Sequence, residues 1–190
     1  QRSYDHIFQE VALQNLPVAF CIDRAGLVGS DGPTHHGLTD IGFLRMMPNL
    51  EIVAPACEAE LRAALDYAVT ADRSVTVRYP RDVIVNGRIE QAALKQPLEP
   101  GRGVVLREGA CNIVLVGLGP MAAEALLAAD ELAKEGIDAT VINPRFAKPL
   151  DPDIVERALA GNTVITVEDH VLAGGFGAAV MEEVASHVAR

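Results

Sequence analysis

Three arginines lie in or just after short apolar runs that are typical of buried strands. Arg24 follows the run 16–22, and Arg78 and Arg81 belong to the end of the run 75–79 and its continuation. Because ligands gather at the carboxyl ends of parallel strands, we expect two or three of these guanidiniums to meet at one edge of a sheet. A guanidinium fork binds phosphate or carboxylate through two parallel hydrogen bonds and stays charged at any working pH. The pattern predicts an anion site, although a single strand-end arginine more often forms a surface ion pair.

A loop at the same expected edge adds groups that can move protons. Residues 30–37 read SDGPTHHG and contain one carboxylate, Asp31, and two imidazoles, His35 and His36. An imidazole titrates near neutrality and can give or take a proton during turnover. Together with the arginines, the loop indicates a site for a small anionic substrate with a reacting carbonyl. Adjacent histidines rarely face one ion, so we predict no metal site, and a role as polar loop filler stays open.

Alternating strand and helix patterns surround these residues and predict an α/β fold with parallel pairing. Helical stripes of apolar residues recur at spacings of three and four, and short apolar runs separate them. The expected strands are 16–22 (buried on both faces), 51–54, 75–79, 112–116, 139–142 and 163–167. The expected helices are 3–14, a short one opened by Thr39 and Asp40, 58–70, 122–134, one opened by Asp151 and Pro152, and 174–189.

The alternation stops between residues 82 and 103, where Asn, Gly and Pro cluster. A linker is the simplest interpretation of such a stretch. We therefore expect two domains, 1–85 and 104–190, joined by a linker over 86–103. The first helix begins without a preceding strand, and the last runs to Arg190 without a capping glycine. Both domains are expected to be partial.

Charge and composition exclude several classes of protein. The net charge is −10, with 26 acidic residues against 16 Lys plus Arg. Proteins that bind nucleic acid or anionic membranes need a dense basic surface, so we expect neither partner. No apolar run reaches the length of a membrane helix. Cys21, Cys57 and Cys111 are scattered, which disfavours disulfides and favours a reducing, cytoplasmic location.

Several motifs along the chain are those of a known family. Residues 23–37 (DRAGLVGSDGPTHHG) resemble the 1-deoxy-D-xylulose-5-phosphate synthase family of transketolase-type, thiamine-diphosphate enzymes. The DGPTH part also occurs in transketolases, and the lead-in DRAGLVG narrows the resemblance. Further matches are QRSYD at 1–5, RYPR at 78–81, RFAKPLD at 145–151, VEDH at 167–170 and GGFG at 174–177. The resemblance covers nearly the whole chain.

The resemblance implies a fold and a reaction. The fold would be two three-layer αβα domains with mainly parallel sheets: part of a transketolase pyrimidine-binding domain, then a transketolase C-terminal domain truncated at its end. The reaction would condense pyruvate with D-glyceraldehyde 3-phosphate and release CO2. The product would feed isoprenoid, thiamine and pyridoxal synthesis. Thiamine diphosphate carries this chemistry, while the protein orients substrates and moves protons.

The resemblance also implies roles for individual residues. Arg24 and Arg81 would bind the phosphate of the acceptor. His35 would donate a proton or hydrogen bond as the aldehyde oxygen becomes an alkoxide. Asp31 would position a hydroxyl group or tune His35. Arg2 would lie near the donor-derived intermediate.

The same resemblance implies that parts of the site lie elsewhere. The glutamate that activates the cofactor, and the domain that holds diphosphate and Mg²⁺, are expected upstream of Gln1. We therefore expect no tightly bound cofactor and no turnover by this chain alone. The missing N-terminal part would be its partner, and the whole enzyme would be a homodimer. His36 is expected to serve loop structure.

Three alternatives remain open. A catalytically inert fragment or interaction module of the same fold is one, because fold does not dictate function. A transketolase or a 2-oxoacid dehydrogenase β-type chain is another, and the DRAGLVG lead-in argues against it. The third is a dinucleotide-binding oxidoreductase, because residues 117–122 (GLGPMA) satisfy G-x-G-x-x-A. That fingerprint requires an acidic residue after the next strand, and the residue at this position is Asn143, which argues against the alternative.

Overall fold

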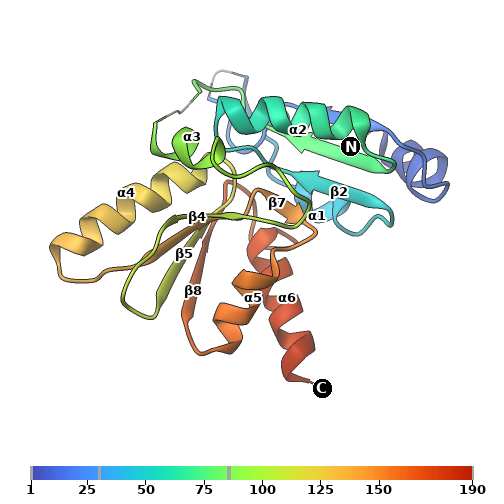
Figure 1. Ribbon diagram of the computed structural model, residues 1–190. Coiled ribbons are helices and arrows are strands. Elements are labelled where there is room, and N and C mark those ends of the chain that lie inside the picture. The colour runs from blue at the N-terminus through green and yellow to red at the C-terminus, as the bar shows by residue number, and fades with distance from the viewer. Residues whose placement is uncertain (1, 30, 85–86, 190) are drawn as a thin grey trace.

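The first of two sheets lies mainly in the N-terminal half of the chain (Figure 1). The computed structural model describes residues 2–29, 31–84 and 87–189. The strand order is β1-β3-β2-β7. Strands β1 (Ala19–Ile22) and β2 (Leu50–Val53) pair parallel to β3 (Ser74–Arg78), whereas β7 (Phe146–Lys148) pairs antiparallel to β2. The carboxyl ends of β1, β2 and β3 therefore share one edge.

Helices cover both faces of this sheet because its strand residues alternate between them. Val75 and Val77 pack with α2 (Glu58–Thr70) on one face. On the other face, α1 (Asp40–Leu44) and the π-helix η1 (His6–Ala12) contribute to a second apolar cluster. The predicted helices of this half are present, and the one expected over 3–14 is shorter and π-helical.

The second sheet has the order β4-β6-β5-β8. Strands β5 (Ile113–Gly117), β6 (Thr140–Asn143) and β8 (Thr163–Val167) are parallel, and β4 (Val104–Arg107) pairs antiparallel to β6. The three parallel strands match the predicted ones. Strand β4 was not predicted, because it follows directly on the loop-like stretch 82–103.

Three helices complete the second unit. Helix α4 (Met121–Lys134) packs on the face to which Leu115 points, whereas α5 (Pro152–Leu159) and α6 (Phe176–Val188) pack on the face of Val116. Figure 1 shows α5 and α6 side by side beneath the first sheet. Each half is thus an αβα unit with a mainly parallel sheet, as expected.

The two units share one core. Buried residues of the first sheet, such as Ile52, lie in the same apolar cluster as Val116 and Phe176 of the second unit. Strand β7 adds to this connection, because it follows β6 of the second sheet in sequence yet pairs with β2 of the first. No strand was predicted there, since three residues before a proline carry too little pattern. The two units are therefore joined both by this shared apolar cluster and by strand β7.

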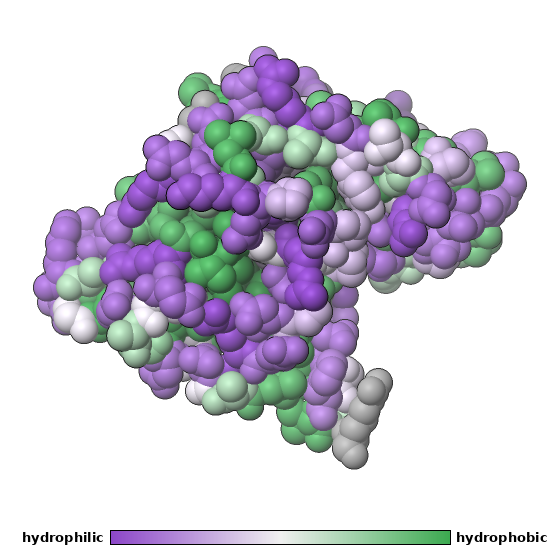
Figure 2. All heavy atoms as spheres, viewed as in Figure 1, coloured by the Kyte–Doolittle hydropathy of each residue, from purple (hydrophilic) through white to green (hydrophobic). Residues whose placement is uncertain are grey.

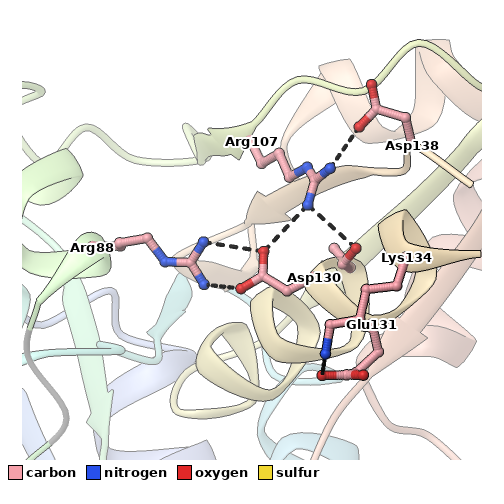
Figure 3. Close-up of polar contacts among 7 residues, drawn as sticks. Arg88, Arg107, Asp130, Glu131, Lys134 and Asp138 are labelled. Carbon is pink, nitrogen blue, oxygen red and sulfur yellow. Dashed lines mark hydrogen bonds and ion pairs between the residues drawn. The ribbon is translucent and has the colours of Figure 1, made fainter. Parts of the chain in front are cut away.

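The stretch expected as a linker contains a helix, α3 (Arg88–Ala93), whose Ile89 is buried. Charged contacts attach this helix to the second unit (Figure 3). Arg88 forms a bidentate ion pair with Asp130 of α4, and Arg107 of β4 contacts the same carboxylate at 3.3 Å. Arg107 also binds Asp138 at 2.7 Å. The polar sequence of this stretch did not predict the helix, because the residues that stabilise it lie in other elements.

Strand β1 differs from the prediction in its burial. It was expected to be buried on both faces, but exposed residues alternate with half-buried ones along it. The reason is its position, because β1 is an edge strand of its sheet.

The molecular face in Figure 2 is largely hydrophilic, and hydrophobic residues gather in a hollow between α3 and β4. Among the described residues, no helix is long and apolar enough to cross a membrane.

Candidate functional site

Two of the predicted arginines meet at one edge of the first sheet. Strands β1 and β3 run parallel with Ile22 opposite Arg78, so the segments that follow them leave the sheet together. Arg24 Nε donates to Asp31 Oδ2 at 2.7 Å, and Arg81 Nη1 donates to Asp31 Oδ1. The Asp31 carboxylate thus lies between the two guanidiniums. This arrangement confirms that the sheet edge brings Arg24 and Arg81 to one anionic group.

These contacts fix the charges of the cluster. Hydrogen bonds from Arg81 and then from Arg24 lower the pKa of Asp31 from 3.8 to about 2. The hydrogen bond to Asp31, together with the nearby charge of Asp23, raises the pKa of Arg24 above its ordinary value. Asp31 and Arg24 are therefore ionised at neutral pH. Asp31 and Asp23 occupy only part of the N–H donors of the two guanidiniums, and Arg81 remains half exposed.

The base of the loop is closed by close backbone contacts. Gly37 N–H donates to the carbonyls of Arg24 and Gly26, both at 2.9 Å, and Gly26 N–H donates to the Gly37 carbonyl at 3.0 Å. A Cβ atom on Gly37 would lie 2.3 Å from the Arg24 carbonyl oxygen, so only glycine fits. Arg24 itself has φ +61°, a conformation that non-glycine residues adopt rarely and often at functional sites.

His35 ends a short 3₁₀ turn, η2 (Pro33–His35), at the tip of the loop. Its Nδ1 lies 2.9 Å from the backbone carbonyl oxygen of Asp31. A carbonyl oxygen only accepts, so the tautomer with the proton on Nδ1 is the one that donates to Asp31, and the Thr34 hydroxyl lies 3.2 Å from the same nitrogen. In the neutral ring, Nε2 is then free to take a proton, and in the charged ring it can donate one. The exposed side chain of His35 is thus oriented by the residue that binds both arginines.

Three further residues considered for the site from the sequence do not join the Arg24–Asp31–Arg81 cluster. His36 Nδ1 accepts the Val28 N–H at 3.0 Å, which is a role in loop structure. Arg2 is exposed, and among the described residues no hydrogen bond or ion pair joins it to the arginine cluster. Arg78, the third arginine considered for the anion site, is buried instead, so only two guanidiniums meet there. Its Nε donates to Asp40 Oδ2 at 2.8 Å inside the protein.

The second unit supplies residues that the sequence reasoning did not single out. Arg78 Nη2 donates to the Asp169 carbonyl at 3.0 Å, and the Asp169 carboxylate accepts the Leu27 N–H at 3.0 Å. The buried His170 ring places Nε2 3.7 Å from Asp40 Oδ1. The signal available in sequence was the acidic pair that follows strand β8, since the carboxyl ends of parallel strands carry sites.

The described residues of the site offer few ligands for a metal ion. Among the residues that the structure describes, no group of three or more His, Cys, Asp or Glu is arranged to hold a metal ion. The donor set of the cluster is cationic, which suits an anion.

Family models match both halves of the chain. The model described as the transketolase pyrimidine binding domain matches residues 1–85, and that of the transketolase C-terminal domain matches residues 101–190. The chain belongs to the transketolase family. The Arg24–Asp31–Arg81 cluster and the loop lie within the pyrimidine binding domain match, whereas Asp169 lies within the C-terminal one. Members of this family are transferases that depend on thiamine diphosphate.

Curated relatives narrow the similarity to one branch of the family. A 1-deoxy-D-xylulose-5-phosphate synthase of Desulfotalea psychrophila is 50% identical over 187 residues, which is 96% of this chain and 28% of the relative. 1-Deoxy-D-xylulose-5-phosphate synthase 2 of Geobacter sulfurreducens is 46% identical over 183 residues, 96% of this chain and 29% of the relative. The chain thus spans less than a third of the length of these relatives.

A solved structure supports the arrangement of the two units. A split gene transketolase, described as an inactive β4 tetramer, superposes with a TM-score of 0.86 and 33% identity. The match covers 97% of this chain and 58% of that chain.

The dinucleotide-binding alternative gains no support from the fold, because the turn before α4 packs toward the first unit. A Cβ on Gly119 would contact Ala54 at 3.6 Å.

Proposed function

We propose that this chain forms the acceptor side of a 1-deoxy-D-xylulose-5-phosphate synthase active site. That enzyme condenses pyruvate with D-glyceraldehyde 3-phosphate, with loss of CO2, and is a transferase of aldehyde or ketone residues. Its product feeds isoprenoid, thiamine and pyridoxal synthesis. The proposal is supported by the convergence of Arg24 and Arg81 on one carboxylate, since this geometry also suits the phosphate of the acceptor.

Asp31 has a positioning task in this proposal. Its carboxylate holds the guanidiniums of Arg24 and Arg81 close together against their mutual repulsion. The N–H donors that Asp31 and Asp23 leave unoccupied then bind phosphate oxygens. The negative charge of Asp31 limits affinity for a dianion, so the phosphorylated product leaves readily after turnover.

His35 handles the proton in this proposal. The aldehyde oxygen of the acceptor gains negative charge as the new carbon–carbon bond forms, and protonated His35 donates from Nε2 to that oxygen. The Asp31 carbonyl keeps the ring turned so that Nδ1 faces the loop. Asp31 thereby couples phosphate binding, through its carboxylate, to proton transfer, through its carbonyl.

The rest of the enzyme belongs to other parts of the protein in this proposal. Thiamine diphosphate, which stabilises the carbanion derived from pyruvate, and Mg²⁺ would be held outside the 190 residues, with Arg2 near the donor side. The whole enzyme would be a homodimer in the cytoplasm. The cytoplasmic location is supported by three cysteines that are all free.

Calorimetric titration with D-glyceraldehyde 3-phosphate tests the acceptor site directly. Arg81→Ala removes a charged hydrogen-bond donor and should weaken binding about 10- to 100-fold. Arg62→Ala, which removes an exposed arginine paired with Glu58 on α2, should leave the affinity unchanged. Equal affinities of the Arg81→Ala variant and the unmodified chain would exclude the phosphate role.

An activity assay tests the reaction itself. The chain is combined with a protein segment that carries the thiamine-diphosphate domain, together with cofactor, Mg²⁺, pyruvate and acceptor. Formation of 1-deoxy-D-xylulose 5-phosphate supports the proposal, and the His35→Gln variant should lose at least about 100-fold in kcat. A folded complex without turnover would favour the alternative of an inert interaction module.

A further inference from the structure

We infer that Asp169 is a positioning residue of the acceptor loop, although it lies in the other unit of the chain. The inference rests on the proposed function, because it assigns a task to a residue that does not touch the substrate groups. The acceptor loop is defined here as residues 24–37, which carry Arg24, Asp31 and His35. Asp169 would hold the base of this loop so that its tip keeps the geometry described above.

The Asp169 side chain contacts the loop at its first turn. Its Oδ2 accepts the backbone N–H of Leu27 at 3.0 Å, across 142 residues of sequence. The backbone of Gly26 passes directly beneath the carboxylate, and a Cβ atom there would lie 1.9 Å from Oδ2. With φ +76°, Gly26 also has a conformation that favours glycine. The loop is therefore shaped to receive this carboxylate.

The backbone around Asp169 contacts the other end of the loop. The Asp169 carbonyl accepts from Arg78 Nη2 at 3.0 Å, and the same nitrogen donates to the Gly37 carbonyl at 2.9 Å. Val171 N–H donates to the Leu38 carbonyl at 3.0 Å. Both ends of the acceptor loop are thus attached to the segment that follows strand β8.

This segment is itself held rigidly. The neighbouring Glu168 accepts the N–H groups of Phe176 and Gly177 at 2.7 and 2.8 Å, which caps the first turn of α6. Leu118 N–H donates to the Val167 carbonyl at 2.9 Å, which ties the end of β8 to the sheet. Asp169 therefore projects from a fixed position, as a residue that orients a loop must.

The consequence for the site follows from the geometry of the loop. Arg24 opens the loop three residues before Leu27, and Gly37 closes it by accepting from Gly26 and donating to Arg24. Loss of the Asp169 carboxylate leaves the turn at Leu27 without its anchor, so the Arg24 guanidinium and Asp31 lose their fixed separation from Arg81. Small displacements of binding groups reduce affinity and rate strongly.

Two measurements on the full chain test the inference. Asp169→Ala should weaken D-glyceraldehyde 3-phosphate binding about tenfold in the calorimetric titration, which is the effect of one charged hydrogen bond. It should also speed hydrogen exchange of the amides of residues 25–29 and 31–38, because the loop base opens more often. Asp169→Asn keeps the shape and an acceptor oxygen, so its effects should be about threefold.

A matched control and separate readouts decide the outcome. Glu135→Ala removes an exposed acidic residue of the same unit and should change neither affinity nor loop exchange. The inference is overturned if Asp169→Ala behaves like Glu135→Ala in both measurements. If the alanine variant does not fold, the same comparison is made between Asp169→Asn and Glu135→Ala. If the unmodified chain binds no acceptor, the proposed function fails, while loop exchange still decides whether Asp169 holds the loop.

Discussion

The buried ion pair between Glu60 and Arg145 makes the strongest prediction for stability. Arg145 Nε donates to Glu60 Oε1 at 2.7 Å, and the two side chains are only 2% and 3% exposed. Glu60 also accepts the Ala56 N–H at 2.9 Å and the Asn143 side-chain amide at 3.0 Å. Helix α2 of the first unit is thereby joined to the end of β6 in the second. Glu60→Ala leaves a buried guanidinium without its counter-charge.

The magnitude follows from that burial. Removing one partner of a buried pair costs about 3–5 kcal/mol, because the remaining charge cannot return to water. The whole free energy of unfolding of a domain is about 5–15 kcal/mol, so Glu60→Ala should remove about a fifth of it or more. With a urea m-value of about 2 kcal/mol/M, the unfolding midpoint should fall by about 2 M.

Urea unfolding followed by circular dichroism measures this change. Glu58→Ala is the matched control, since Glu58 pairs with Arg62 on the exposed side of the same helix, and that pair should contribute about 0.3–0.5 kcal/mol. The double variant Glu60→Ala with Arg145→Met should recover part of the loss, because no charge remains buried. Midpoints of Glu60→Ala and Glu58→Ala within about 0.25 M of each other would refute the reasoning.

Three further predictions concern the loop and a helix cap. The Asp31 carboxyl should titrate near pH 2 by NMR and move back toward its ordinary pKa in Arg81→Ala. Because the folded-state pKa is depressed, its stabilising contribution is complete above about pH 4 and disappears as the pH falls through about 2. Gly37→Ala should destabilise the protein by about 1–3 kcal/mol in thermal unfolding, because its Cβ meets a backbone oxygen at 2.3 Å. Asp151→Ala should cost about 1–2 kcal/mol in the same assay, since its carboxylate caps α5 at 3.0 Å.

Each of these has an outcome that contradicts it. An Asp31 midpoint that stays put when Arg81 is removed would mean that the arginine does not hold the carboxylate in solution. Gly29 has open space where a Cβ would lie, so Gly29→Ala is the control for Gly37→Ala, and equal melting temperatures would rule out the close-contact explanation. Unchanged melting of Asp151→Ala would show that water replaces the cap.

Local patterns were sufficient for most elements and for half of the site. Buried parallel strands appear in a sequence as short apolar runs, so β5, β6 and β8 could be predicted directly. The meeting of Arg24 and Arg81 could be predicted as well, because parallel neighbours bring their carboxyl ends together. The cap formed by Asp151 and the following proline also rests on local chemistry.

Strand β7, helix α3 and the true position of Arg78 depended on distant residues. Alternation along β3 places Arg78 opposite to Val77, but it says nothing of what covers that face. The partners are Asp40, 38 residues away, and Asp169, 91 residues away. A buried guanidinium and an exposed one have the same sequence pattern, and only the tertiary packing of both units distinguishes them.

The amino-acid sequence alone determined which chemical groups the candidate site has: two arginines, a carboxylate and an imidazole on one loop and one sheet edge. Side-chain type and strand polarity are local properties, and local properties can be read along a chain. The tertiary structure decided how those groups are held, through β7 crossing into the first sheet and Asp169 reaching Leu27. Such contacts arise only when two folded units bury a common core, because that burial selects their mutual position.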